Sequence, residues 1–380
     1  AASDVYKRQG LTYKNNNVEE LTEKIIYMLN NSVDRKEFGK NGYKAYLKYF
    51  AKEAFYENAK KAIKDTYKNA EQNRQKSQFY DCQKQISIVI PTYNAEKFLN
   101  KGLSSFLVCR DTDAQTAQHN CKMATEGRFE EIDIDKAILD KLEVIVVNDG
   151  TPDKSVEVAQ KFVDWYPDTF VIVNKTNGGH GSAINTGVEH VRGKYLKVVD
   201  ADDWVDTLAL KHLVEYLEHV DSDAVIQSFR YYDISKDEYR PADVSVPDFT
   251  REYNLKDIVN MWDDVFDGLS FHGVIYNTGF YKALGYKLTE HVFYEDQEYA
   301  TVPFSYAKTV RFIQEELYVY RVGDVNQSVS AASQVKRLPD LEQVIFNVLE
   351  AEKSFAKMPQ GGKEHFIRKT SGIILSLIHI

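Results

Sequence analysis

The spacing of hydrophobic residues changes near residue 85. Before that point, residues 10–70 show the three-to-four-residue repeat of an amphipathic helix, as at Val18, Leu21, Ile25 and Leu29, and no strand signal. Residues 71–84 are polar and unpatterned, which indicates a linker. We therefore predict a helical appendage, residues 1–70, joined by a linker to a different kind of domain.

Short, continuous apolar runs alternate with helical patterns from residue 85 onward. The predicted strands are 86–90, 142–147, 170–173, 195–199 and 224–229, and the predicted helices are 95–107, 154–165, 182–190 and 207–217. Runs buried on both faces that alternate with helices are typical of βαβ units. The fold class is therefore α/β, with a mainly parallel central sheet flanked by helices. A C-terminal helical segment, truncated, is expected over residues 331–380.

Residues 108–140 interrupt this alternation with a polar insertion. We interpret it as a surface excursion and its Cys109, His119 and Cys121 as residues without a ligand role. The three cysteines of the chain form no C-x-x-C pair and are odd in number, which argues against a zinc site and a disulfide framework. A reducing, cytoplasmic location fits this usage best.

Composition excludes several classes of protein. Hydrophobic residues make up 43% of the chain, enough for a packed core, and the formal charge of −9, with Lys and Arg dispersed, argues against nucleic acid as a partner. No apolar run approaches the roughly 20 residues that span a bilayer, and no signal peptide is recognisable. We expect a cytoplasmic protein and leave open a peripheral contact with the inner face of the membrane.

Both ends of the chain resemble translated adapter sequence, in AASDVYKRQ at the start and LSLIHI at the finish. We set these residues aside from fold reasoning and expect the native polypeptide to continue in both directions. The apolar tail, residues 373–380, is accordingly not interpreted as a membrane anchor.

Polar residues follow the first two predicted strands. Pro91 is expected to end the first ladder and to place Thr92, Tyr93 and Asn94 at the carboxyl edge, where open α/β sheets bind ligands. An ordinary strand-to-helix turn is the alternative. After the second strand, Asp149 and Gly150 suit hydrogen bonding to a nucleotide base. The alternative is that Asp149 or Thr151 caps the helix that begins near Lys154.

The most informative feature is the apolar strand that runs into Asp200, Ala201, Asp202 and Asp203. Carboxylates at the mouth of a buried strand repel one another, and a divalent cation with a preference for oxygen relieves the repulsion. We therefore predict Mn²⁺ or Mg²⁺ at Asp200 and Asp202, with positions left open for a diphosphate. A solvated acidic turn is the alternative.

A glycine-rich segment, NKTNGGHGSAINTG, lies between these motifs. Gly178 and Gly179 let the backbone approach a ligand closely, and Asn185 lies on the helix that follows. His180 is a candidate contact for a pyrophosphate. A loop histidine without function is an equally weighted alternative.

The motifs IPTYN, VNDGTPD, NGGHGSAINTG and DADDW, in this order and spacing, resemble the family 2 glycosyltransferases of GT-A fold over residues 85–330. The resemblance implies a donor-binding half, 85–230, and an acceptor half, 231–330. It also implies that Thr92, Tyr93 and Asp149 hold uridine, that Asp200 and Asp202 hold metal and sugar, and that transfer inverts the anomeric centre.

The same resemblance assigns residues of the acceptor half. It places the general base in the pair Glu295 and Asp296, on Asp296, with Glu298 outside the site. Arg321 lies in the loop that closes over the donor and is available to a phosphate. Family members often carry a histidine in this loop, so its absence leaves the third metal contact open.

Residues 10–70 resemble the last helices of family 4 glycosyltransferases of GT-B fold, in GLTYKNNNVEELTEKI and DRKEFGKNGYKAYLKYF. A remnant of an upstream GT-B module and a plain helical extension are both compatible with this segment.

Together these features predict an inverting hexosyltransferase that moves a sugar from a nucleotide-sugar donor, expected to be a UDP-sugar, to a hydroxyl of a glycan or lipid-linked acceptor in cell-surface polysaccharide synthesis. A nucleotidyltransferase is one alternative. A catalytically silent nucleotide-sugar-binding module of a larger bifunctional glycosyltransferase is the other.

Overall fold

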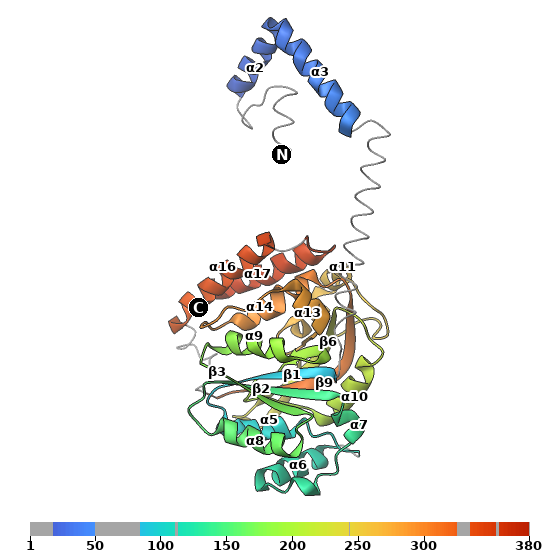
Figure 1. Cartoon of the computed structure of the whole chain (residues 1–380), viewed down its shortest axis with the longest axis vertical. Helices are drawn as coiled ribbons and strands as arrows, with labels where there is room; N and C mark the ends of the chain where they lie inside the picture. The colour runs from blue at the N-terminus through green and yellow to red at the C-terminus, as the bar shows by residue number, and fades with distance from the viewer. Residues whose placement is uncertain are drawn as a thin grey trace. The chain divides into compact units, whose positions relative to one another are not determined.

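The computed structural model describes residues 18–49, 84–110, 113–242, 244–324, 335–354 and 357–379 (Figure 1). The chain divides into two compact units, Ala1–Lys76 and Ser77–Ile380. The predicted linker contains this division, but its residues 71–83 lie outside the described residues.

The first unit contains helices α2 (Val18–Asn30) and α3 (Ser32–Tyr49), where the sequence predicts helix. The Tyr27 hydroxyl donates a hydrogen bond to the Asp34 carboxylate and ties the two helices together. Leu29 and Val33 are exposed. The remaining predicted helical residues, 10–17 and 50–70, lie outside the described residues.

The second unit is built on a nine-stranded sheet of order β3-β2-β1-β4-β8-β6-β9-β5, with β7 beside β6. The strands are β1 (Lys84–Thr92), β2 (Leu142–Asp149), β3 (Phe170–Lys175), β4 (Gly193–Val198), β5 (Trp204–Val205), β6 (Ala224–Asp233), β7 (Glu238–Ala242), β8 (Val274–Asn277) and β9 (Val310–Val322). Strands β1 to β4 pair in parallel, β8 is antiparallel to both β4 and β6, and β9 is parallel to β6. Strands β1, β2, β3, β4, β6 and β9 therefore share one direction, and the predicted mainly parallel sheet is confirmed.

Helices cover both faces of the sheet. They are α5 (Glu96–Ser104), α6 (Ala114–Glu126), α7 (Lys136–Leu139), α8 (Ser155–Trp165), α9 (His180–His190), α10 (Thr207–Leu217), α11 (Leu255–Asn260), α12 (Trp262–Val265), α13 (Thr278–Leu284), α14 (Glu295–Thr301), α16 (Leu338–Ser354) and α17 (Gly362–His379), with short 3-10 turns η1 (Phe129–Glu131), η2 (Asp267–Leu269) and η3 (Phe304–Tyr306). In Figure 1, α5, α6 and α8 lie on one side of the sheet, and α9, α14, α16 and α17 on the other. Local signals set some boundaries: Asp206, for example, accepts from the backbone N–H groups of Leu208 and Ala209 and begins α10.

The alternation of side chains along β1 divides the hydrophobic core between the two faces. Ile86, Ile88 and Ile90 belong to the cluster that also holds buried residues of α5, α8 and α10. Val89 belongs to the cluster that holds Ala183 and Ile184 of α9. The strand is therefore buried on both faces, which accounts for its continuous apolar run.

Two local predictions are wrong. Pro91 does not end the first ladder: it lies opposite Val147 of β2, and only the pairing with β4 stops, at Val89 and Val198. Proline lacks a backbone N–H, which would point to only one neighbouring strand, so the ladder with the other neighbour, β2, can continue. The insertion 108–140 is more than a surface excursion, because Phe129 is buried and packs edge-on against Phe162 of α8, with ring centroids 5.1 Å apart.

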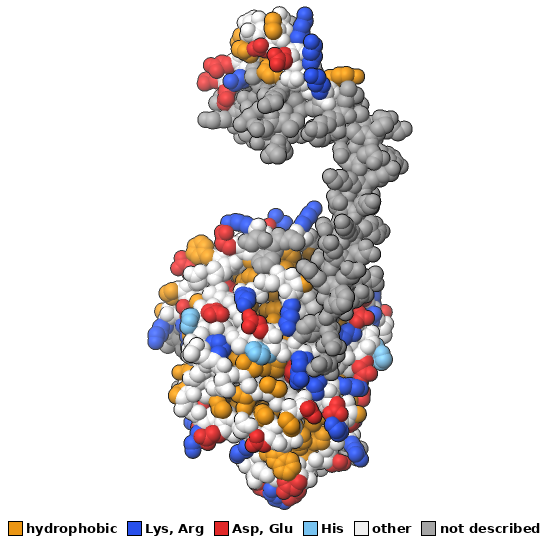
Figure 2. Space-filling model, viewed as in Figure 1, with side chains coloured by type: hydrophobic (Ala, Val, Ile, Leu, Met, Phe, Trp, Pro, Cys, Tyr) orange, Lys and Arg blue, Asp and Glu red, His pale blue; other side chains and the backbone are white. Residues whose placement is uncertain are grey.

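Helices α16 and α17 pack against α14 and η3. Val344, Val348 and Phe366 form a cluster with Val302 and Tyr306, just after α14. The tail set aside as adapter-like continues α17 as far as His379. Ile373, at the start of that apolar tail, is buried against Leu341 and Ile345. Within the described residues, no helix combines the length and hydropathy needed to cross a bilayer. Basic and acidic side chains are interspersed on the face shown in Figure 2.

Candidate active site

A cleft of about 670 Å³ opens where β1 and β4 end. It is lined by Asn94, Glu96, Lys97, Phe98, Asp153, Asp200, Asp202, Tyr320, Arg321 and Asp324. Four of the predicted site residues, Asn94, Asp200, Asp202 and Arg321, are therefore among its lining residues. This is the carboxyl edge of the parallel strands, where the fold places ligand sites.

The loops after β1 and β2 are tied together beneath one wall of the cleft. The Asn94 N–H donates to Thr151 Oγ1 at 2.8 Å, and the Thr151 hydroxyl donates to Asp153 Oδ1 at 2.7 Å. Burial tends to raise the pKa of Asp153, but hydrogen bonds from Ser155, Glu96 and Thr151 lower it to about 2. Asp153 thus gives the cleft a carboxylate that is ionised at neutral pH.

The residues that precede Asn94 lie differently. Thr92 is buried, and its hydroxyl donates to the Ile90 carbonyl of its own strand at 3.0 Å. Tyr93 is 49% exposed. Pro91 and Thr92 thus form the end of the strand below the cleft, while Tyr93 offers an exposed ring beside it.

Asp149 is buried and organises the glycine-rich segment. Its Oδ1 accepts from Lys175 Nζ at 2.6 Å and from the Gly178 N–H at 2.9 Å, and its Oδ2 accepts from the Gly179 N–H at 2.9 Å. At the start of α8, the Ser155 backbone N–H instead donates a hydrogen bond to Asp153 Oδ1. The alternative in which Asp149 caps that helix is therefore wrong.

The glycines bring two protein segments together. Gly150 and Gly179 have positive φ angles of 68° and 85°. A Cβ on Gly179 would lie 3.1 Å from the His291 nitrogen, and the His291 N–H donates to the Gly178 carbonyl at 2.8 Å. The close approach predicted for a ligand is thus made here by the loop before α14.

Asn185 is not brought to the cleft. Its side-chain amide donates to the Leu288 carbonyl at 2.8 Å and accepts from the Leu288 N–H at 2.9 Å. It fixes the same loop from α9, so its role in the described residues is to join the two halves of the domain.

His180, the first residue of α9, bridges the two halves. Its Nε2 lies 2.8 Å from Asp200 Oδ1 and its Nδ1 lies 2.5 Å from Glu295 Oε1. Burial lowers the pKa of His180, but the two carboxylates more than offset this and raise it well above its usual value. Both ring nitrogens of His180 are thus directed to carboxylates, a contact set that the sequence did not predict.

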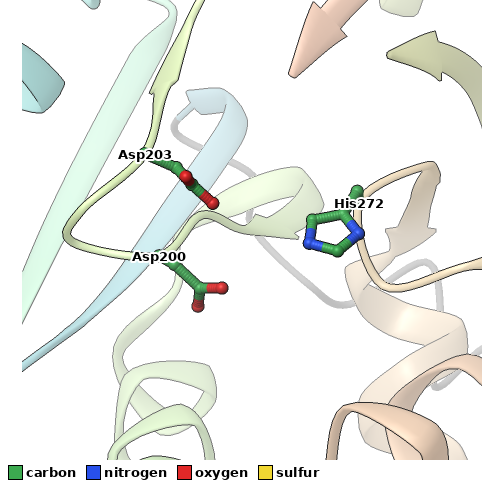
Figure 3. Close-up of side chains that lie close together, drawn as sticks. All are labelled: Asp200, Asp203 and His272. Atoms are coloured by element: carbon green, nitrogen blue, oxygen red, sulfur yellow. The ribbon is translucent and has the colours of Figure 1, made fainter. Parts of the chain in front are cut away.

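Three side chains form a candidate cation site, shown in Figure 3: ligand atoms of Asp200, Asp203 and His272 all lie within 4.8 Å of one another. Asp202 is outside this group, with its Oδ2 3.6 Å from Arg321 Nη1. Burial, then the charges of Asp202 and Asp200, raise the pKa of Asp203 well above its usual value. A divalent cation would offset this repulsion at Asp203, and the carboxylate oxygens suit Mn²⁺ or Mg²⁺.

Helix α14 presents the predicted base. Tyr294, with a φ of 72°, turns the chain into the helix, so that Glu295 and Asp296 occupy its first turn. Burial, then the charges of Glu295 and Asp200, raise the pKa of Asp296 to about 6. Glu295 is 5% exposed, and its Oε2 has no hydrogen-bond partner among the described residues. Glu298 is buried and accepts from the Thr289 N–H and hydroxyl, consistent with its exclusion from the site.

Arg321 closes the other side of the cleft. Its guanidinium lies over the Phe98 ring at 4.3 Å, and its Nη2 lies 2.7 Å from Asp324 Oδ2. Its backbone N–H donates to Asp203 Oδ1 at 2.7 Å. Arg321 thus connects β9 to the acidic cluster. The loop that follows, residues 325–334, lies outside the described residues.

Comparison with known sequences shows which enzymes this chain resembles. Residues 134–285 match the family described as Glycosyl transferase family 2. The chain is a glycosyltransferase.

Two curated relatives illustrate the extent of the similarity. The glycosyltransferase is 24% identical over 282 residues to EpsJ of Bacillus subtilis, named an uncharacterized glycosyltransferase, with 71% of this chain and 69% of EpsJ covered. It is 24% identical over 254 residues to the glycosyltransferase GlyA of Streptococcus pneumoniae, with 62% of this chain but only 30% of GlyA covered. Among solved structures, TarS of S. aureus in complex with UDP-GlcNAc has 17% identity and a TM-score of 0.49, over 77% of this chain and 81% of that one.

Two residues of the glycosyltransferase's site were missed from sequence. Asp203 stood beside the predicted pair, and its side chain, rather than that of Asp202, lies in the cation cluster. His272 stands just before β8, in FHGVIYNTGF, and β8 lies between β4 and β6. In the sequence, the only indication of His272 was a single histidine before a short apolar run. The order of the strands in the sheet is what brings it beside Asp200.

Proposed function

We propose that this glycosyltransferase transfers a sugar, with inversion, from a nucleoside-diphosphate sugar, preferably a UDP-sugar, to a hydroxyl of a glycan or lipid-linked acceptor. The observation that carries the proposal is a chain of contacts. The candidate base Asp296 adjoins Glu295, which contacts His180, which contacts Asp200 at the cleft. This chain of contacts supports a site in which donor carboxylates and an acceptor-side base act together.

Asp296 would accept the proton of the acceptor hydroxyl. A carboxylate with a pKa of about 6 is ionised at neutral pH and is a stronger base than an exposed aspartate. Glu295, held by His180, would orient the acceptor or the base. Inversion follows if the hydroxyl oxygen attacks the anomeric carbon from the face opposite the leaving diphosphate.

Asp200 and Asp203, the carboxylates of the cation cluster, would hold Mn²⁺ or Mg²⁺, with Asp202 beside them at the cleft. When bound, the ion would neutralise the charge of the leaving diphosphate. Asn94, Tyr93, Asp149 and Gly150 would border the nucleoside, and Arg321 would contact a phosphate. Asp149 keeps acceptor capacity for a base N–H, because its Oδ2 accepts one hydrogen bond in the described structure.

A role in cell-surface polysaccharide synthesis is supported by the relatives. One of them, GgaB of Bacillus subtilis, is named a minor teichoic acid biosynthesis protein and is 28% identical over 133 residues. That match covers 35% of this chain and 12% of GgaB. An upstream GT-B module and a peripheral contact with the membrane remain proposals that concern parts of the protein beyond this site.

Product analysis with the full chain tests the proposal. Incubation with a panel of nucleotide sugars and Mn²⁺ should release free UDP from one donor, and chelation should stop the release. Asp202→Ala should weaken UDP binding in calorimetry, whereas Asp263→Asn, an exposed acidic residue outside the cleft, should not. Release of pyrophosphate would instead indicate nucleotidyl transfer, and binding without product would indicate a silent module.

A further inference from the structure

His272 has the surroundings of a metal ligand. No hydrogen bond to either of its ring nitrogens is found among the described residues, although a ring nitrogen lies within 4.8 Å of carboxylate oxygens of both Asp200 and Asp203. Figure 3 shows the imidazole facing the two carboxylates from the opposite side of the site. Two ligands of one Mg²⁺ lie at most about 4.2 Å apart, twice a bond of about 2.1 Å, so small rotations suffice to close the site.

Aromatic rings hold the imidazole in this orientation. The Tyr320 ring, which lines the cleft, stacks on it with centroids 4.1 Å apart and an interplanar angle of 24°. The Tyr318 ring meets it edge-on at 4.9 Å, and the Phe229 ring lies at 5.3 Å. Rotation of the imidazole away from the carboxylates would break these contacts, so the ring is pre-organised.

The backbone of His272 is fixed as well. Lys197, fully buried in β4, donates from its Nζ to the His272 carbonyl at 2.7 Å, and Gln227 of β6 donates from its Nε2 to the same carbonyl at 3.1 Å. Two buried side chains from flanking strands thus converge on one carbonyl. Burying a lysine ammonium costs free energy unless the group is hydrogen-bonded. Here its hydrogen bond fixes the turn before β8.

The other histidine near the carboxylates is already engaged. Both ring nitrogens of His180 lie at hydrogen-bond distance from carboxylates, Asp200 and Glu295. Ligation by His180 would therefore break an existing contact, whereas the ring of His272 has no hydrogen bond to the described residues that ligation would break.

We propose that His272 is the nitrogen ligand of the divalent cation, with Lys197 as a positioning residue that fixes it. The loop after Tyr320 contains no histidine that could supply the third protein contact to the metal. His272 would supply that contact from the turn before β8. This inference rests on the proposed metal-dependent transfer and adds to it the ligand and its source.

The test is electron spin echo spectroscopy of Mn²⁺ bound to the full chain with UDP, with histidine labelled with ¹⁵N. The wild type should show a ¹⁵N coupling, and His272→Gln should lose it. We expect His272→Gln to weaken Mn²⁺ binding by at least about 10–100-fold, the range seen even for residues that only support a ligand. Lys197→Met should weaken binding within that range but keep the coupling, the result that separates positioning from ligation.

His180→Gln should keep the coupling, and His212→Gln, which removes an exposed histidine paired with Glu315, should change neither coupling nor affinity. Absence of a ¹⁵N coupling in the wild type would overturn the proposal, and this measurement does not require any variant to fold. Loss of the coupling in His180→Gln would also overturn it, by assigning the ligand to His180. UDP release with Mn²⁺ but without ¹⁵N coupling would leave the proposed transfer intact, whereas failure to bind Mn²⁺ at all would overturn both.

Discussion

At the scale of single residues, the acidic side chains around the cleft differ in proton affinity because their neighbours differ. Asp153 accepts several hydrogen bonds and its pKa falls to about 2, whereas burial near other carboxylates raises the pKa of Asp296 to about 6. Carboxylates separated in this way can hold different roles in one reaction. Of these two, Asp296 has the pKa suited to proton transfer near neutral pH.

Asp296→Asn should abolish sugar transfer and leave UDP binding nearly unchanged. Asparagine keeps the size and polarity of the side chain but cannot accept the hydroxyl proton, and loss of a general base costs about 10²–10⁴-fold in rate. Turnover at saturating donor and UDP affinity by calorimetry check this. Glu295→Gln should be milder, and an inactive Glu295→Gln beside an active Asp296→Asn would move the base by one residue.

The rate should rise with pH through the pKa of Asp296 and then level off. The base acts only when ionised, so activity is lost as pH falls below about 6. A cation near Asp200 would offset one of the charges that raise this pKa, so the measured midpoint should be about 6 or lower. A pH profile of kcat/KM gives the midpoint, and activity that increases as pH falls below 6 would contradict the assignment.

At the scale of elements, the junction of β2, β3 and α9 is organised by buried polar contacts. Asp149 at the end of β2 holds Lys175 of β3 and the two glycines before α9. His180 then joins the start of α9 to Asp200 after β4 and to Glu295 of α14. The glycine-rich loop therefore joins the ends of β2 and β4 to α14.

Asp149→Ala should lower both thermal stability and UDP affinity while metal dependence persists. It leaves the Lys175 ammonium and two amides without their acceptor, and each hydrogen bond that involves a charged group is worth about 1.5–3 kcal/mol. Thermal unfolding and calorimetry measure the two effects. Asp168→Ala, at an exposed turn, is the matched control. Unchanged UDP affinity in a folded variant would leave Asp149 a purely structural role.

His180→Ala should lower the Tm, and Mn²⁺ should raise the Tm of this variant more than that of the wild type. The variant leaves Asp200 and Glu295 without the imidazole between them, so a cation becomes the remaining counter-charge. Thermal unfolding with and without Mn²⁺ tests this, with His219→Ala, at an exposed site, as control. If Mn²⁺ raised the Tm of His180→Ala and of the wild type equally, His180 would not be coupled to the cation site.

At the scale of the whole molecule, the chain comprises two units of different construction. The unit Ser77–Ile380 has its own core on both faces of the sheet, and α16 and α17 pack on the element that carries Asp296. The unit Ala1–Lys76 contains helices α2 and α3. The C-terminal helices thus pack with the residues that follow α14.

A variant that begins at Ser77 should fold and keep donor binding. Its core clusters lie within the second unit, so the loss of the first removes none of their members. Circular dichroism, a cooperative thermal transition and UDP calorimetry check this against the full chain. An insoluble or non-cooperative product would show that the N-terminal helices complete the fold.

The sequence by itself determined five of the strands, β1, β2, β3, β4 and β6, and the edge at which the site lies, but not β5, β7, β8 or β9. The helix and strand periods are local, and parallel strands necessarily bring their carboxyl ends together, so the residues after β1, β2 and β4 could be grouped without a structure. This grouping predicted Asn94, Asp200 and Asp202 as neighbours, and the cleft contains all three. The pair on α14 could be placed by resemblance alone.

Tertiary structure decided which side chains meet across that edge. His180 contacts residues 20 and 115 positions away, and His272 reaches Asp200 only because β8 inserts between β4 and β6, antiparallel to both. Asn185 and the glycines likewise bind the loop before α14 rather than the cleft. Such contacts depend on strand order and long-range packing, which a local hydrophobic period does not encode.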